Sequence, residues 1–344
     1  MPVDLLGLPF ANLAAFLDEV GVGAHHAGRV FRGMHHHGLA LPDIPDLGRH
    51  AQVIAERSTI ASAVVESAHV NPDETEKLVV RLCDGQRVEA VLVPMRSDRW
   101  TLCVSSQVGC AMACTFCATG TLGLTRSLTA GEIVAQVMAA RAHTSGGARR
   151  LTRLVFMGMG EPLHAYDSVR DAISVLMDDH GLGLGSKHIT VSTVGLVKRL
   201  ADLARDTGGR IQLAISLHAG TDETRRAIVP TARTTSLATL RDAVHAWPLP
   251  GSRAVMVEVV VLPGVNDGDA DLDGIAWFME GLRGVVNLIP FNPFPGAPFT
   301  PPTEAQVLAM DAGLRARGVH TRIRWPRGRT VSGACGQLML ASSP

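Results

Sequence analysis

Residues 103–117 read CVSSQVGCAMACTFC, and this stretch guides the interpretation of the rest of the chain. It contains Cys110, Cys114 and Cys117 in the spacing CxxxCxxC, which places three thiolates on one short loop. Soft thiolate ligands select iron–sulfur clusters, zinc or Cu(I) over hard cations. A structural zinc site is usually closed by four protein ligands in paired short spacings, and no CxxC or HxxxH partner follows at finger distance. We therefore favour a [4Fe–4S] cluster with one iron free to bind a small molecule over zinc or a loop that binds nothing.

The composition bounds the class of protein. The chain has 344 residues, which is long for one domain, although a single α/β barrel can reach this length. The hydrophobic fraction is 46%, but no window approaches the uninterrupted apolar run of about 18 residues that a membrane helix needs. The first residues lack the features of a signal peptide, so we expect a cytoplasmic protein. Four of the six cysteines fall between 103 and 117, which indicates local chemistry and not a disulfide scaffold.

The charge balance gives no sign of a nucleic-acid partner, because Lys plus Arg equals Asp plus Glu at 32 each. Only a clustered basic face could supply the electrostatic attraction that nucleic acid requires. Taken alone, each basic cluster is expected to be ordinary solvated surface. The clusters are Arg149-Arg150-Arg153, Lys198-Arg199, Arg225-Arg226-Arg233 and Arg322-Arg324-Arg327-Arg329.

Residues 1 to about 65 are predicted to be helical. Leu13, Phe16, Leu17 and Val20 recur at helical spacing, and a second helical pattern covers 24–34. The histidines of this part are predicted to lie on the surface, because no carboxylate or cysteine completes an obvious metal site around them. They are His25, His26, His35, His36 and His37.

A β-hairpin is predicted next. The apolar runs 78–82 and 88–93 are joined across Asp84-Gly85, a pair typical of a tight turn in which both residues have positive φ. Cys83, at the end of the first strand, is expected to be structural. Glu89 lies inside the second strand, where the pattern alone favours an exposed alternate position.

Beyond residue 100 the chain alternates strands with helices, which predicts an α/β fold with a parallel sheet, either open or curved toward a barrel. A capping box, Thr129 with Glu132, opens the first helix. The predicted strands are 101–105, 154–157, 188–194, 210–217, 254–262, 285–291 and 320–326. The predicted helices are 130–142, 167–179, 195–206, 237–247, 270–282 and 303–317.

Small, hydroxyl and amide residues recur at the ends of these strands. Ligands of parallel sheets bind at the carboxyl ends, so these groups are predicted to share one rim. Together they suit a polar small molecule that has an amine, a carboxylate and a ribose. They are Gly158-Met159-Gly160-Glu161-Pro162, Ser192-Thr193, Ser216-Leu217-His218, and the segment from Asn287 to Asn292.

At this point the sequence resembles a known family. CxxxCxxC with Phe116 before its last cysteine looks like the signature of radical S-adenosylmethionine (SAM) enzymes, and residues 158–162 resemble their GEP motif, which grips the methionine amine of SAM. A longer set of segments resembles the dual-specificity RNA methyltransferases of the RlmN and Cfr type, with the RlmN branch closest. These segments are 103–126, 156–163, 216–218, 287–298 and 334–338. The resemblance implies a radical-SAM partial (β/α)6-type barrel with a small helical N-terminal domain.

The resemblance also implies cofactors and site residues. Cys110, Cys114 and Cys117 would hold the [4Fe–4S] cluster, whose free iron binds SAM and whose electron cleaves it to a 5′-deoxyadenosyl radical. The reaction would use two SAM molecules per turnover. The residues implied to line the SAM site are Gly160, Glu161, Ser192, Ser216, Leu217, His218 and Asn292.

Three further residues are implied to be catalytic. The residues alone would make Cys335 a spare buried cysteine, but in the family its position takes a methyl group from SAM and then links covalently to adenine. Glu89 matches the position of the proton acceptor. Cys103 matches the resolving cysteine, which would form a transient disulfide with Cys335.

The family reaction is methylation of adenine carbon 2 in 23S ribosomal RNA, with transfer RNA as a further substrate. The alternatives are carbon 8 of adenine, an inactive RNA-binding paralogue, and a radical-SAM enzyme acting on a small molecule or peptide. The implied electron donor is a protein such as flavodoxin, and a monomer is expected. The implied division of the chain is a helical RNA-docking domain (1–70), a hairpin (77–98), the barrel (99–326) and a catalytic cysteine loop with the tail (327–344).

The chain departs from the family near the catalytic loop. Arg327-Gly328 is followed by Arg329-Thr330-Val331, where the family usually has an acidic and an aliphatic residue. This departure removes no catalytic group, but it lies in a region expected to meet RNA.

Overall fold

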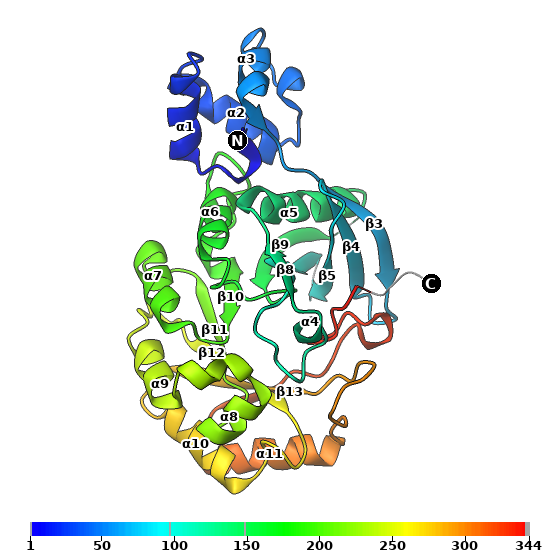
Figure 1. Ribbon diagram of the computed structural model, residues 1–344, viewed down its shortest axis with the longest axis vertical. Coiled ribbons are helices and arrows are strands. Elements are labelled where there is room, and N and C mark those ends of the chain that lie inside the picture. Colours follow the sequence, from blue (N-terminus) through cyan, green and yellow to red (C-terminus); the bar gives the residue numbers. More distant parts are fainter. Residues whose placement is uncertain (1, 96–97, 148, 341–344) are drawn as a thin grey trace.

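A computed structural model describes residues 2–95, 98–147 and 149–340. Its N-terminal part is helical as far as Arg57 and stands at one end of the molecule (Figure 1). Leu13, Phe16 and Leu17 are buried, as their spacing predicts. The elements here are β1 (Val3–Asp4), η1 (Leu5–Gly7), α1 (Phe10–Glu19), η2 (Ala24–His26), α2 (Ala27–His35), η3 (Leu41–Asp43), α3 (His50–Arg57) and β2 (Ser58–Thr59).

His35 does not lie on the surface, contrary to the sequence prediction. It is 1% exposed, and its two ring nitrogens lie 2.9 Å from the carbonyl oxygens of Phe31 and Leu6. Burial lowers the pKa of His35, and its contacts with the Leu6 and Phe31 carbonyls oppose that shift. The other predicted surface histidines, His25, His26, His36 and His37, are exposed or half-buried.

The main body is one ten-stranded sheet in the order β14-β13-β12-β11-β10-β9-β6-β5-β4-β3. Its parallel strands are β6 (Arg99–Cys103), β9 (Arg150–Phe156), β10 (Ile189–Thr193), β11 (Gln212–Ser216), β12 (Val255–Val261), β13 (Gly284–Pro290) and β14 (Thr321–Ile323). The sheet curves into a partial barrel with helices on its outer face (Figure 1). These are α5 (Ala130–Thr144), α6 (Tyr166–Met177), α7 (Val197–Thr207), α9 (Leu237–His245), α10 (Asp269–Met279) and α11 (Glu304–Ala316).

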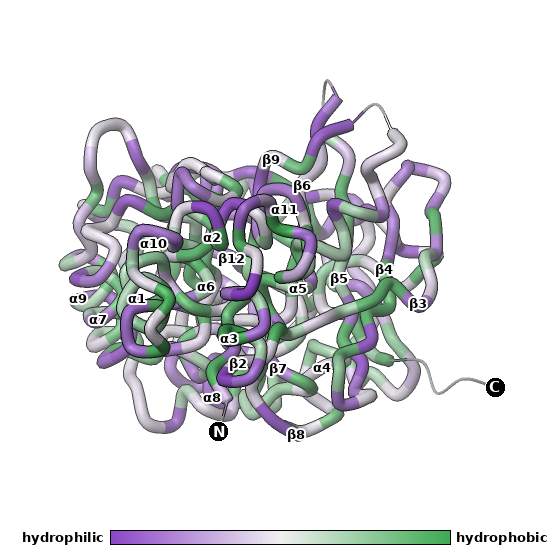
Figure 2. Tube along the Cα trace, turned by 90° about the horizontal axis from the view of Figure 1, so that it is seen from above, coloured by the Kyte–Doolittle hydropathy of each residue, from purple (hydrophilic) through white to green (hydrophobic). Residues whose placement is uncertain are grey.

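The sequence explains both the buried sheet and the helices that cover it. The central strands of the barrel are mostly buried because they are covered on both faces, and β12 is buried along nearly its whole length. Thr129 and Glu132 form the predicted capping box at the start of α5. Apolar segments run mainly through the interior and polar ones toward the periphery (Figure 2). None of the helices within the described ranges has the length and apolar character of a membrane-crossing segment.

An antiparallel extension continues the sheet beyond β6. It consists of β3 (Ala63–Val70), β4 (Glu76–Leu82) and β5 (Arg87–Met95). The sequence assigned the start of β3 to the helical part, and this was wrong, because β3 is paired along its length with β4. The β4–β5 hairpin was predicted correctly, but its turn was not. Among the described residues of this turn only Gly85 has positive φ, +83°, because the loop is longer than two residues and ends in a bulge.

The remaining short elements lie around the mouth of the barrel, except η4, which precedes β10 at the opposite end. They are β7 (Gln107–Gly109), α4 (Ala118–Thr121), β8 (Leu124–Ser127), η4 (Ser186–His188), α8 (Asp222–Ile228), η5 (Pro230–Thr234) and η6 (Arg329–Val331). The C-terminal segment crosses from β14 toward the antiparallel extension. Arg327 donates a hydrogen bond to the Pro94 carbonyl, and the Gly328 amide donates one to Asp73. This segment therefore joins the two sides of the open barrel and carries Cys335 to its mouth.

Candidate active site

The three cysteines of CxxxCxxC lie between β7 and α4, as predicted from the loop spacing. The amide of Cys110 donates to the Gly123 carbonyl (2.8 Å), and that of Cys117 donates to the Cys114 carbonyl (3.2 Å). Burial raises the pKa of each thiol, that of Cys110 to about 12. The charges of Cys117 and Cys110 raise the pKa of Cys114 further, so the three sulfur atoms face a common space.

The chemistry of this donor set fits an iron–sulfur cluster. Three buried thiolates repel one another, so they need a strongly cationic partner to ionise together. Within the described ranges, no three His, Cys, Asp or Glu side chains are close enough to share a single metal ion. In a cuboidal cluster each thiolate binds a different iron, so the sulfur atoms stand further apart than around one ion. The thiolate donor set therefore fits a cluster with one iron left open to a small molecule.

The GEP segment follows β9 and lies beside the cysteines. Gly160 has φ +100°, and a Cβ atom there would lie 2.5 Å from Cγ of Gln107, so only glycine fits. The carboxylate of Glu161 accepts hydrogen bonds from the amides of Leu163 and Val194, both at 2.9 Å. Glu161 thus ties its own loop to the end of β10. Its charge also contributes to the raised pKa of Cys110, which places it next to the triad.

Ser192, Ser216, Leu217 and His218 come together at the ends of β10 and β11, as predicted. The hydroxyl oxygens of Ser192 and Ser216 lie 3.3 Å apart. His218 accepts a hydrogen bond at Nδ1 from the Val260 amide (3.2 Å), which leaves its proton on Nε2. Burial lowers the pKa of His218 to about 3, so the ring is neutral.

The His218 ring also connects this rim to the cysteine loop. It packs edge-to-face against Phe116, with ring centroids 4.5 Å apart. Phe116 lies between the second and third cysteines of the triad, so the residues predicted for SAM and those predicted for the cluster form one continuous site.

Asn292 follows β13, and both ends of its amide group contact the C-terminal loop. Its Nδ2 donates to the Cys335 carbonyl (3.1 Å), and its Oδ1 accepts from Nε of Arg329 (3.0 Å). The Ala118 amide, directly after the triad, donates to the Gly336 carbonyl (2.7 Å). The loop of Cys335 is therefore held at the mouth from two sides.

Cys103 ends β6, and the C-terminal loop brings Cys335 near enough for its charge to act on the Cys103 thiol. Burial raises the pKa of Cys103 to about 12, and the second cause of this shift is the charge of Cys335. Both cysteines are free thiols. Cys103 therefore interacts with a cysteine from the far end of the chain.

Cys335 is solvent-exposed, yet burial raises its pKa to about 11. The exposure and the raised pKa agree if the Cys335 thiol is reached by solvent but is surrounded by protein on its other sides. Glu258, in the middle of β12, is the second cause of that raised pKa. Glu258 is 7% exposed and accepts a hydrogen bond from Asn287 (2.8 Å), and burial raises its own pKa to about 7.

Glu89 is fully buried, so the exposed position that the strand pattern favoured is wrong. Oε1 of Glu89 lies 3.0 Å from Nζ of Lys77 on β4, although the angle does not suit a directed hydrogen bond. Burial raises the pKa of Glu89, and the Lys77 charge opposes this shift. Removing one partner of a buried ion pair costs roughly 3–5 kcal/mol. The Ser105 hydroxyl donates to the Glu89 carbonyl, which places Glu89 beside the start of the cysteine loop.

Sequence reasoning missed two charged residues of this region, Lys77 and Glu258. It also placed the cluster of Arg225 on the solvated surface, which is wrong for Arg225 because this side chain is only 1% exposed. A signal was present for Glu258, because one carboxylate interrupts the apolar strand VMVEVVV. Cys83, expected to be structural, is exposed in the hairpin turn.

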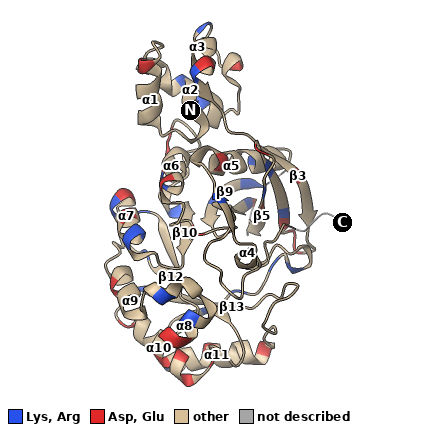
Figure 3. Ribbon diagram, in the orientation of Figure 1, with Lys and Arg blue, Asp and Glu red and all other residues tan. Residues whose placement is uncertain are grey.

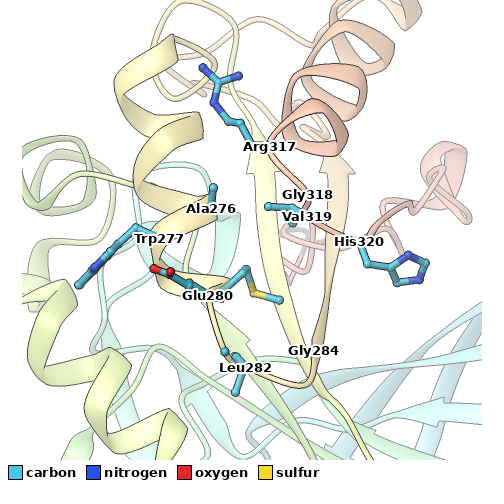
Figure 4. A pocket seen from close by; sticks show the side chains of 11 residues that line it. Ala276, Trp277, Glu280, Leu282, Gly284, Arg317, Gly318, Val319 and His320 are labelled. Atoms are coloured by element: carbon cyan, nitrogen blue, oxygen red, sulfur yellow. The ribbon is translucent and has the colours of Figure 1, made fainter.

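A pocket of about 530 Å³ lies away from this site (Figure 4). Its lining includes Trp277, Glu280, Gly284, Arg317 and His320. Gly284 begins β13, so the pocket is at the amino ends of the strands, opposite the cysteines. Ligands of parallel sheets bind at the carboxyl ends, so the pocket has no part in the site.

Comparisons with known proteins agree with this arrangement. The sequence model described as the radical SAM superfamily matches residues 104–273. The dual-specificity RNA methyltransferase RlmN of Phenylobacterium zucineum is 41% identical, with 97% of this chain and 90% of the relative covered. The protein of the same name from Halorhodospira halophila is 42% identical, with 98% and 94% covered. A crystal structure of a radical SAM methyltransferase from Sphaerobacter thermophilus superposes with a TM-score of 0.90 at 39% identity, covering 98% of this chain and 99% of that one.

Proposed function

The chain belongs to the radical SAM superfamily and, within it, to the RlmN family of dual-specificity RNA methyltransferases, and on this premise we propose that it methylates carbon 2 of an adenine in 23S ribosomal RNA. Transfer RNA is the proposed second substrate. The enzyme is a SAM-dependent RNA methyltransferase with a [4Fe–4S] cluster. We further propose that it works as a cytoplasmic monomer, receives electrons from a protein such as flavodoxin, and docks RNA through its helical N-terminal part.

The chemistry explains why the site needs both a cluster and a cysteine. A ring carbon of adenine is a poor nucleophile, so direct attack on the SAM sulfonium would be very slow. The cluster, when bound, supplies the electron that opens a radical route from SAM. In our proposal Cys110, Cys114 and Cys117 hold it. The groups that bind and orient SAM are Gly160, Glu161, Ser192, Ser216, Leu217, His218 and Asn292.

Three residues of the chain carry the methyl group and release the product. Cys335 takes the methyl group from a first SAM as S-methylcysteine, and a second SAM activates it for addition to adenine. Glu89 removes the proton from the ring carbon, and the adduct gives up its unpaired electron, for which the cluster would be the acceptor. The Cys103 thiolate then forms a disulfide with Cys335, and the methyl carbon leaves sulfur with the bonding electron pair and takes up a proton.

The proximity of Cys335 to Cys103 is the observation that supports this proposal most. A radical SAM enzyme acting on a small molecule or peptide needs the triad and the GEP segment, but it has no use for a second cysteine near Cys335 at the mouth. An inactive RNA-binding paralogue would have no reason to keep Glu89 buried beside Lys77 at a cost in stability.

Exposed arginines beside the catalytic loop support a polyanionic substrate. Arg322, Arg324, Arg327 and Arg329 are all exposed. Guanidinium groups contact phosphates and supply most of the affinity for nucleic acid. Elsewhere both signs of charge are spread over the molecule, with acidic residues gathered on α10 (Figure 3).

Mass spectrometry of ribosomal and transfer RNA nucleosides, from cells with and without the gene, tests the proposal. We expect 2-methyladenosine to disappear from 23S rRNA, and from tRNA, when the gene is removed. Loss of 8-methyladenosine instead would identify the alternative carbon. Unchanged nucleosides in both RNAs would refute an RNA-methylating function.

The ligand assignment predicts the effect of Cys110→Ala. Anaerobically reconstituted wild-type protein should show a broad charge-transfer absorbance, and the variant should lose it together with most of its iron, because one thiolate of three is missing. Cys83→Ala is the matched control, since Cys83 is exposed in a turn, and it should keep both signals. Four irons retained in Cys110→Ala would refute the assignment.

A further inference from the structure

Arg225 is a buried cation that the proposed reaction does not use. It lies on α8, three residues before Ile228, so both side chains lie on the inward face of this short helix. Arg225 is among the largest fully buried side chains, at 1% exposed. A guanidinium keeps its charge in proteins, so a full positive charge stands inside the fold.

The described part of the chain gives this guanidinium backbone carbonyls and no carboxylate as hydrogen-bond partners. Nε donates to the Leu217 carbonyl (3.2 Å), and Nη2 donates to the Val194 carbonyl (2.6 Å). These carbonyls satisfy N–H groups without neutralising the charge. A buried charge is costly unless an opposite charge lies near it. Burial lowers the pKa of Arg225, and the Asp222 carboxylate, three residues earlier on α8, opposes this shift but forms no hydrogen bond with the guanidinium, so a further anion close to it would stabilise the charge.

The cysteine loop lies directly against α8 (Figure 1). The Thr115 amide donates to the Ile228 carbonyl at the end of the helix (3.0 Å). Cys114 and Ile228 belong to the same apolar cluster. The nearest candidate for the missing anion is therefore the thiolate-bound cluster.

We propose that Arg225 is a positioning residue whose buried charge stabilises the reduced state of the iron–sulfur cluster. Reduction by one electron adds one negative charge to the cluster and its thiolates, with no bond made or broken. A fixed cation in a region of low dielectric stabilises that added charge more than it stabilises the oxidised state. Arg225 also holds the ends of β10 and β11 together through the same two carbonyls. The inference rests on the proposed cluster ligands, but not on the RNA or the methylated carbon.

A redox titration of the reconstituted full-length protein tests this, with dithionite as reductant, EPR detection of the reduced cluster, and no SAM or RNA. We expect Arg225→Gln to lower the equilibrium constant for reduction at least about tenfold, a shift of about 59 mV toward more negative potential. Arg225→Lys should stay near the wild type because it keeps the charge. Arg226→Gln is the matched control, since Arg226 is exposed on the same helix, and it should change nothing.

Several outcomes would overturn the proposal. Arg225→Gln with full iron and an unchanged potential would show that its charge does not act on the cluster, even if the variant binds SAM more weakly. If Arg225→Gln assembles no cluster, the iron content of Arg225→Met and Arg225→Lys tests the proposal instead. A cluster that assembles in the lysine variant alone would show that the positive charge is what matters. An equal loss of iron in all three variants would refute a role for the charge. Failure of the ligand assignment is separately visible as iron retained in Cys110→Ala.

Discussion

Cys335→Ala is expected to reduce RNA methylation by at least about a thousandfold, because the covalent route from SAM to adenine disappears with its sulfur atom. The cluster should assemble normally, since Cys335 is not one of the proposed iron ligands. The hydrogen bonds from Asn292 and the Ala118 amide that hold the loop go to the backbone carbonyls of Cys335 and Gly336, which alanine retains. The variant should therefore fold like the wild type, and the loss should be chemical.

Intact-peptide mass spectrometry separates this role from a structural one. Active protein should carry one added methyl group on Cys335 and none on Cys83. A wild-type enzyme that turns over with an unmodified Cys335 would contradict the proposed intermediate, as would a Cys335→Ala variant that methylates RNA at more than about a hundredth of the normal rate.

The sequence predicted most of the cluster site because its parts are local. Three cysteines within eight residues must lie on one loop, and strand ends in a parallel α/β fold must share one rim. The partnership of Cys103 with Cys335 came only from the family resemblance. Spacing could not reveal it, because the C-terminal segment crosses the open side of the barrel in irregular structure.

Errors arose where short-range patterns carry too little information. The strand holding Glu89 is covered on both faces, so alternation could not tell a solvent face from a buried one. The helix of Arg225 has only seven residues, which is too short for a recognisable period. Lys77 and Arg225 can be recognised as part of the site only when their burial is known, because the effect of a buried charge depends on the groups that surround it.

Cys103→Ala is expected to stop turnover after one covalent addition and to accumulate the protein–RNA adduct in near-stoichiometric amounts. The variant keeps Cys335 and Glu89, so the methyl carbon can reach adenine, but no thiolate faces the Cys335 sulfur to break the bond between sulfur and carbon. The adduct should appear as a slow band in denaturing gels and should disappear after nuclease treatment. Cys83→Ala, which removes an exposed cysteine in the hairpin turn, should turn over normally. Normal turnover by Cys103→Ala would refute the resolving role. Failure to form any adduct would instead place Cys103 before the covalent step, because a resolving thiol acts only once the Cys335–RNA bond exists.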